Sequence, residues 1–130
     1  MPKKRISHLY QYLSEDKNAL AKQIRENMEL VSNQMKQNFE TAYNQMKQNI
    51  EMASNQMKQN IEMTAAMTRY FNLMGGTLNN EVNAAIENAK NEMLASAERV
   101  KNEMLASVER VKNEMLASVQ KVKDSFWKNK

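Results

Sequence analysis

Apolar side chains recur along the chain with helical spacing. Between residues 24 and 61, and again between residues 82 and 122, successive apolar positions are three or four residues apart. Such spacings bring side chains to one face of an α-helix, whereas a half-buried strand needs alternation with a period of two. The pattern therefore predicts an all-α protein with two long amphipathic helices.

Both predicted helices are built from repeats of eleven residues. The first array starts at Asn33 and reads NQMKQNFETAY, NQMKQNIEMAS and NQMKQNIEMTA. The second starts at Asn80 and reads NEVNAAIENAK, NEMLASAERVK, NEMLASVERVK and NEMLASVQKVK. Eleven residues over three turns give about 3.67 residues per turn, slightly more than in a straight helix, which favours a right-handed supercoil. We therefore expect a weakly right-handed coiled coil with an eleven-residue (hendecad) repeat.

The apolar positions define a predicted helix-packing seam. Its members in the first helix are Ile24, Met28, Val31, Met35, Phe39, Ala42, Met46, Ile50, Ala53, Met57 and Ile61. Its members in the second are Val82, Ile86, Ala89, Met93, Ala97, Val100, Met104, Val108, Val111, Met115, Val119 and Val122. The second helix adds a second contact line, formed by Leu94, Leu105 and Leu116. Because one neighbouring helix cannot cover both lines, the pattern favours a bundle of three or more helices.

A Gly-Gly pair separates the two arrays. Gly75 and Gly76 suit the end of a helix, since glycine adopts the left-handed conformation without steric cost. Ser14 is a candidate N-cap of the first helix, and Thr77 or Asn79 is a candidate cap of the second. An earlier start of the first helix stays open, because Leu9 and Leu13 already have helical spacing. The expected segments are a basic N-terminal arm or short helix at 1–13, helices at 14–74 and 80–127, a turn at 75–79 and a tail at 128–130.

Two arrangements around Gly75 and Gly76 remain open, an antiparallel hairpin and a kink in one rod. The hairpin is favoured because short connections join antiparallel helices and because both arrays share one period. In the expected register Met57 faces Leu94, and this match repeats along both helices. A hairpin of two helices has little interior, so we expect it to associate, most simply as a dimer of hairpins that forms a four-helix bundle.

The charge of the chain is concentrated at its ends. The formal net charge is +4, and folding back would bring basic residues of both termini to one tip. This predicted basic tip consists of Lys3, Lys4, Arg5, Lys121, Lys123, Lys128 and Lys130. Such a tip is a candidate contact for anionic lipid headgroups or a phosphate backbone.

Candidate chemistry changes this interpretation little. The chain has two Gly, one Pro and no Cys, which excludes disulfides, thiolate metal sites and a fold rich in turns. His8 is the only histidine, and no phosphate-binding loop, nucleophile motif or dinucleotide fingerprint occurs. We expect no catalytic, cofactor or metal site. With no signal peptide and no membrane span in the sequence, we expect a cytoplasmic protein.

Methionine is unusually frequent, with 12 residues, several of them on the seam. The flexible thioether fills irregular cores, and it also suits a seam that opens onto an apolar surface. Two further methionines, Met52 and Met63, lie about 130° away from the seam on the helical wheel.

Amphipathic helices with eleven-residue repeats resemble three groups of proteins: phasins, lipid-surface helices of the perilipin and apolipoprotein kind, and late-embryogenesis-abundant proteins. That resemblance implies an amphipathic coat on lipid or storage-granule surfaces. The narrow seam, bordered by Asn and Gln, instead favours packing between helices. The prediction is a non-enzymatic, self-assembling coiled-coil protein, a subunit of a bundle, rod or filament, with itself as main partner. A lipid-coat protein is the alternative, and a hairpin that contacts nucleic acid through its basic tip is the third hypothesis.

Overall fold

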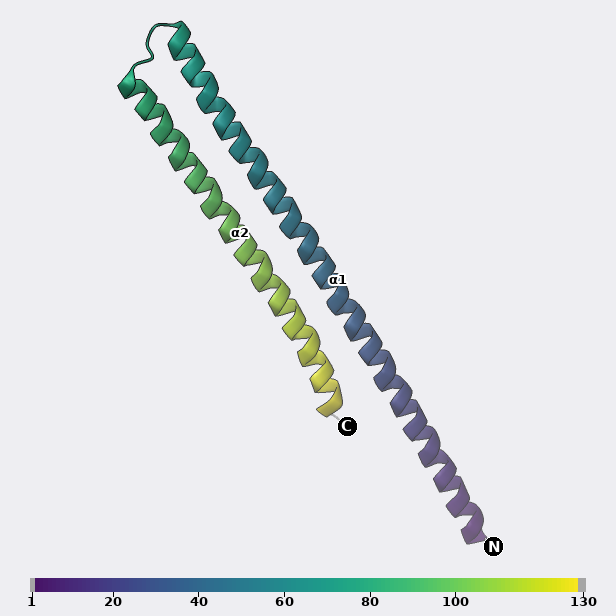
Figure 1. Ribbon diagram of the computed structural model, residues 1–130. Helices are drawn as coiled ribbons and strands as arrows, with labels where there is room; N and C mark the ends of the chain where they lie inside the picture. Colours follow the sequence, from purple (N-terminus) through teal and green to yellow (C-terminus); the bar gives the residue numbers. More distant parts are fainter. Residues whose placement is uncertain (1, 129–130) are drawn as a thin grey trace. The chain divides into compact units, whose positions relative to one another are not determined.

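The computed structural model consists of two α-helices, α1 (Pro2–Met74) and α2 (Asn80–Lys128), joined by a short connection (Figure 1). The structure describes residues 2–128, and side chains over residues 8–128. Within these residues there is no strand, and the two helices pack against each other as a hairpin. The predicted all-α hairpin is confirmed, and the kinked rod is excluded.

Helix α1 begins earlier than the sequence analysis expects. It starts at Pro2, so residues 2–13 belong to α1 and Ser14 lies inside the helix, where it cannot act as an N-cap. The physical reason is that Leu9 and Leu13 already have helical spacing and that no glycine or proline separates them from the first repeat array. Proline is well tolerated in the first helical turn, because its missing N–H would have no partner there.

Backbone and side-chain hydrogen bonds close the connection between the helices. Gly76 adopts a positive φ of 70°, the conformation that glycine adopts most easily. The amides of Thr77 and Leu78 both donate to the Asn72 carbonyl, at 2.8 and 3.0 Å, which satisfies the end of α1. At the start of α2, the Asn79 side chain accepts a hydrogen bond of 2.8 Å from the Val82 amide. Asn79 is therefore the N-cap of α2, one of the two expected candidates.

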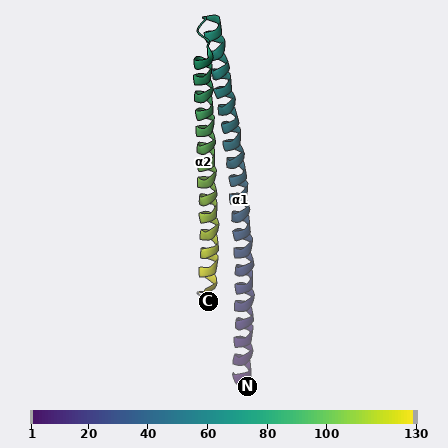
Figure 2. The ribbon, with the colours of Figure 1, turned by 60° about the vertical axis from the view of Figure 1, so that its left-hand side comes forward.

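Contacts divide the chain into two units, residues 41–113 and residues 1–40 with 114–130. In each unit a stretch of α1 lies antiparallel beside a stretch of α2, as a second view also shows (Figure 2). In the unit 41–113, the Lys112 ammonium lies 4.2 Å from the centre of the Tyr43 ring. In the other unit, Lys123 Nζ lies 2.7 Å from a carboxylate oxygen of Glu29.

The interior between the helices is small. Among the described residues, the buried side chains are all of small or medium size: Ser32, Ser54, Ala65, Ala97 and Val119. No large side chain in this part of the chain is fully buried. Small residues allow two helices to approach closely, but they remove little apolar surface from water. The hairpin therefore leaves much of its apolar surface uncovered.

Polar pairs across the hairpin set its register. Lys58 pairs with Glu98, and Arg69 pairs with Glu87. Arg69 lies eleven residues after Lys58 in α1, and Glu87 lies eleven residues before Glu98 in α2. In the other unit, Lys36 donates a hydrogen bond of 3.0 Å to Gln120, the side chain that occupies the Glu98 position two repeats later. In the expected register, in which Met57 faces Leu94, the numbers of facing residues sum to 151, whereas these pairs sum to 156 and the pair Glu29–Lys123 sums to 152.

Candidate functional site

The structure divides the predicted seam into a covered and an exposed line. The covered members are buried or half-buried between the helices: Met28, Phe39, Ile50, Ile61, Val82, Ile86, Ala97, Val108 and Val119. The exposed members are Ile24, Val31, Met35, Ala42, Met46, Ala53, Met57, Ala89, Met93, Val100, Met104, Val111, Met115 and Val122. A single seam between two helices is therefore not what the hairpin forms.

The second contact line of α2 takes part in the hairpin itself. Its members are half-buried, although the sequence analysis assigns them to a second neighbour: Leu94, Leu105 and Leu116. On α1 the covered line is completed by residues that the seam does not include: Ser32, Tyr43, Ser54 and Ala65. Their common signal is their position, four residues after Met28, Phe39, Ile50 and Ile61 in every repeat. They were missed because Ser and Tyr do not stand out as apolar.

The methionines of the seam remain exposed in both units. In the unit 41–113, Met46, Met57, Met93 and Met104 have exposed fractions of 48% to 53%. In the other unit, Met35 and Met115 have exposed fractions of 42% and 44%. In each unit, we call these methionines, with the exposed Ala and Val residues beside them, the methionine face of that unit. Fractions near one half mean that much of each side chain is open to solvent in the hairpin.

Helical geometry places the methionines of α1 and α2 on the same side of the hairpin. With a repeat of eleven residues, each residue advances about 98° around the helix. Relative to Ile61, Lys58 then lies about 65° to one side and Met57 about 33° to the other. On α2, Glu98 and Met104 flank the contact with α1 in the same way. Because Lys58 and Glu98 meet on one side of the hairpin, the methionines of both helices lie on the opposite side.

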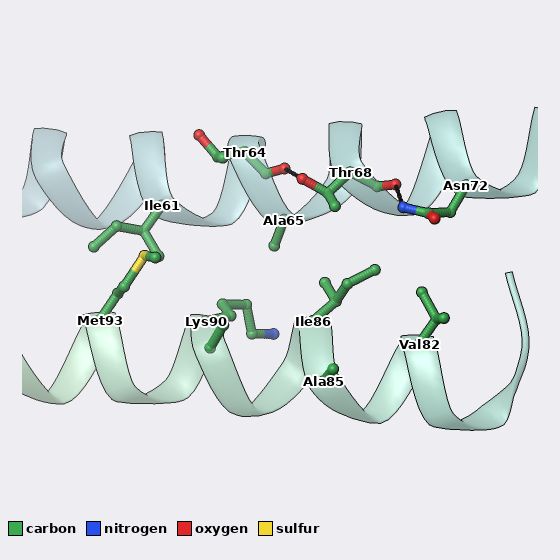
Figure 3. Close-up of a pocket in the computed structure, with 11 residues that line it drawn as sticks. Ile61, Thr64, Ala65, Thr68, Asn72, Val82, Ala85, Ile86, Lys90 and Met93 are labelled. Atoms are coloured by element: carbon green, nitrogen blue, oxygen red, sulfur yellow. Dashed lines mark hydrogen bonds between the residues drawn. The ribbon is translucent and has the colours of Figure 1, made fainter. Parts of the chain in front are cut away.

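A groove near the connection marks where the methionine face ends. It has a volume of about 350 Å³, and Figure 3 shows Ile61 of α1 and Met93 of α2 pointing toward each other along it. On α1 its wall carries Thr64 and Thr68, which take the positions of Ala53 and Met57 one repeat later. The Thr64 and Thr68 hydroxyls each donate a hydrogen bond of 2.8 Å to the α1 backbone. Since these polar groups are already satisfied within α1, the groove offers few groups to orient a small ligand.

The sequence analysis expects the two basic segments to meet at one tip, but the backbone of α1 runs past the end of α2. The last turn of α2 lies beside Arg25, whose guanidinium is 5.2 Å from the centre of the Trp127 ring. Helix α1 continues from there to Pro2, about 35 Å at 1.5 Å per residue. The physical reason is length, because α1 has 73 residues and α2 has 49.

The basic side chains are accordingly dispersed. Lys121 and Lys128 are exposed, whereas Lys123 is half-buried and paired with Glu29. The remaining members of the predicted tip have side chains outside the described residues: Lys3, Lys4, Arg5 and Lys130. The described lysines do not form a compact anion-binding cluster.

Several titratable groups of the described residues form ion pairs on the surface. Hydrogen bonds from Lys58, and then from Lys101, lower the pKa of the Glu98 carboxyl from its ordinary value of 4.5. Over the described part of the chain, no group of three or more His, Cys, Asp or Glu side chains could hold a metal ion. Surface pairs of this kind fix register more than they contribute stability.

Comparisons with known proteins leave the surface as the main guide to function. No protein-family model matches the chain, and no significant match occurs among curated proteins or solved structures. Over the residues described, neither helix contains an apolar stretch that could cross a membrane.

Proposed function

We propose that this chain is a structural, non-enzymatic subunit that associates with further copies of itself through the methionine face. The observation that carries this proposal is the exposure of four seam methionines, 48% to 53% each, on one side of the helix pair in the unit 41–113. The partner is a second hairpin, and the simplest product is a four-helix bundle. The repeat period of eleven residues favours a right-handed supercoil in that bundle.

The small interior supports a second copy as the partner. A soluble helix pair with only small buried side chains gains little from burial, so it is stabilised when a further apolar layer is covered. Completing the burial of each half-exposed methionine contributes about 1 kcal/mol. The methionines recur every eleven residues on both helices, so two such faces match each other in several layers at once. The flexible thioether fits where those layers are uneven.

Two double variants with identical composition test this proposal. Met46→Glu with Met57→Glu places charges on the methionine face, where we expect a loss of association. Met52→Glu with Met63→Glu places the same charges on exposed side chains, of 66% and 60%, about 130° around α1. The second variant should associate like the original chain. Light scattering after size exclusion gives the molar mass, and circular dichroism shows that both variants remain helical.

The same measurement addresses the lipid-coat alternative. A preformed bundle has full helicity and a cooperative melting transition in buffer alone. A coat protein would be a monomer in buffer and would gain helicity on anionic liposomes. A monomeric, fully helical chain in buffer would contradict the proposal of self-association.

A further inference from the structure

The segment of α1 that extends beyond α2 carries an apolar stripe of its own. Every side chain over residues 8–20 is exposed, and we call this segment the N-terminal extension. Leu9, Leu13 and Leu20, with Ile24 at the base of the extension, have exposed fractions of 38% to 58%. Their spacings of four, seven and four residues place them on one line of a helix with an eleven-residue repeat. These aliphatic side chains therefore receive little cover from α2.

Val31 and Met35 continue the same line within the same unit. Leu9, Leu20 and Val31 follow one another at intervals of eleven residues, as do Leu13, Ile24 and Met35. The stripe of the extension therefore continues the methionine face of the same unit, and a second copy that covers one can cover the other.

Two opposite charges border the stripe, one on each flank. Asp16 and Lys17 are exposed, and with Leu13 and Leu20 they line one shallow hollow on the extension. At about 98° per residue, Asp16 lies about 50° to one side of the stripe and Lys17 about 50° to the other. These are the positions from which charged side chains reach across a helix pair and choose its orientation.

The two orientations of a pair differ in which charges meet. In a parallel, in-register pair, opposite flanks of the two identical helices face each other, so Lys17 of each copy lies near Asp16 of the other. In an antiparallel pair centred on the same residues, equal flanks face each other, so Lys17 lies near Lys17 and Asp16 near Asp16. Opposite charges favour the first orientation, and like charges disfavour the second.

We propose that two copies of this chain pair through their N-terminal extensions in parallel and in register, with an Asp16–Lys17 ion pair on each side of a Leu9, Leu13, Leu20 and Ile24 core. This inference rests on the proposed function in taking a second copy as the partner. It adds the orientation of the two copies and a second surface that holds them together.

A charge-swap series tests the pairing. Asp16→Lys and Lys17→Asp each place like charges across both flanks of a parallel pair, and we expect each to weaken association about fivefold to tenfold at low salt. The double variant Asp16→Lys with Lys17→Asp restores opposite charges and should restore association. Neither position has a charged residue three or four positions away in α1, so these changes leave the ion pairs within the helix unaltered. Equal association by all four chains would overturn the ion pairing.

Single cysteines test the orientation directly, because the chain contains no Cys. In a parallel, in-register pair, Leu13→Cys lies opposite itself, so the variant alone should form a disulfide-linked dimer in an oxidised glutathione buffer. Asn18→Cys lies about 150° around the helix from the stripe and should remain unlinked under the same conditions. An antiparallel pair would link Leu13→Cys to Leu20→Cys in a mixture but not to itself, and that result would overturn the proposal.

The two proposals fail separately. If the methionine-face variant Met46→Glu with Met57→Glu dissociates while the charge-swap series has no effect, the proposed function stands and the pairing of the extensions is wrong. If Leu13→Cys links to itself but the methionine-face variant associates normally, the extensions pair and the methionine face is not the surface that holds the copies together.

Discussion

Lys58 of α1 and Glu98 of α2 form an ion pair across the hairpin. Glu98 also contacts Lys101, whose ammonium lies 3.2 Å from the second carboxylate oxygen. One carboxylate therefore connects a residue of the opposite helix with the next turn of its own helix. Because Arg69 and Glu87 form the equivalent pair one repeat away, a slip of the helices by a few residues would break both contacts.

The stability of the hairpin should fall in acid partly through Glu98. Its pKa is lowered in the folded chain, first by the hydrogen bond from Lys58 and then by that from Lys101. The stabilising contribution is therefore complete above the ordinary value of 4.5 and is lost as the pH falls through the lowered value. Glu98→Gln should make the melting temperature less dependent on pH below about 4.5, as thermal melts monitored by circular dichroism between pH 2 and 7 would show.

Glu103→Gln is the matched control for that measurement, because Glu103 is exposed on the side of α2 away from α1. The control should keep the acid dependence of the original chain. An acid dependence that is identical in all three chains would show that the Lys58–Glu98 pair does not contribute to stability.

Replacing Ser54 with alanine should stabilise the hairpin. Ser54 is buried, with an exposed fraction of 7%, and its hydroxyl has no hydrogen-bond partner. A buried hydroxyl without a partner costs about 1 to 3 kcal/mol, so Ser54→Ala should raise the free energy of unfolding by about 1 kcal/mol or more. Ala65 already occupies the equivalent position one repeat later and is equally buried.

The matched control is Ser107→Ala, at an exposed position of α2 in the same unit. Alanine also has the higher helix propensity, by about 0.5 kcal/mol, and the control measures that part alone. Urea unfolding of both variants gives the difference. A gain no larger at Ser54 than at Ser107 would mean that the Ser54 hydroxyl is not a source of instability.

Sequence patterns could predict the helices and the hairpin but not which side of the seam faces inward. Apolar spacing and the Gly75–Gly76 pair were enough for two antiparallel helices. Apolar periodicity could not show whether the line of Met57 or the line of Ile61 faces the other helix. The two residues lie only about 33° apart on the helical wheel, and both are apolar. The polar pair Lys58–Glu98 decides it, and opposite charges at matching repeat positions were the signal that apolar periodicity alone ignores.

The sequence predicted which residues form the candidate site, but not that the hairpin covers some of them and exposes the others. The exposed methionines all belong to the predicted seam, but the sequence analysis treats the seam as one surface, whereas the hairpin covers one line and exposes the other. The basic tip failed for a different reason. With Ser14 as the expected N-cap, residues 1–13 were treated as a separate arm or short helix, whereas the structure makes residues 2–13 a straight continuation of α1.

The connection should tolerate substitution at Gly76 only by residues that accept a positive φ. A side chain at a φ of 70° is strained, so Gly76→Ala should lower the free energy of unfolding by about 1 kcal/mol. Gly76→Asn should cost less, because asparagine adopts this conformation more readily than alanine. Urea unfolding of the two variants measures the difference. Equal stabilities would indicate that the chain reaches α2 through another backbone conformation.

The N-terminal extension should exchange its amide hydrogens rapidly unless copies associate. All side chains over residues 8–20 are exposed, so no neighbour packs against this segment in the single hairpin. An isolated helix of this length is only marginally stable in water. At low concentration we expect the extension to exchange faster than residues 41–113, where α1 and α2 contact each other. At high concentration the pairing of two extensions should slow its exchange, while residues 41–113 change less. Mass spectrometry of peptides from both regions measures this. In the variant Lys17→Asp, the slowing of exchange in the extension should need a concentration about fivefold to tenfold higher. Exchange of the extension that is slow at all concentrations would mean that the segment is stable without a partner, and the reason for pairing it would be lost.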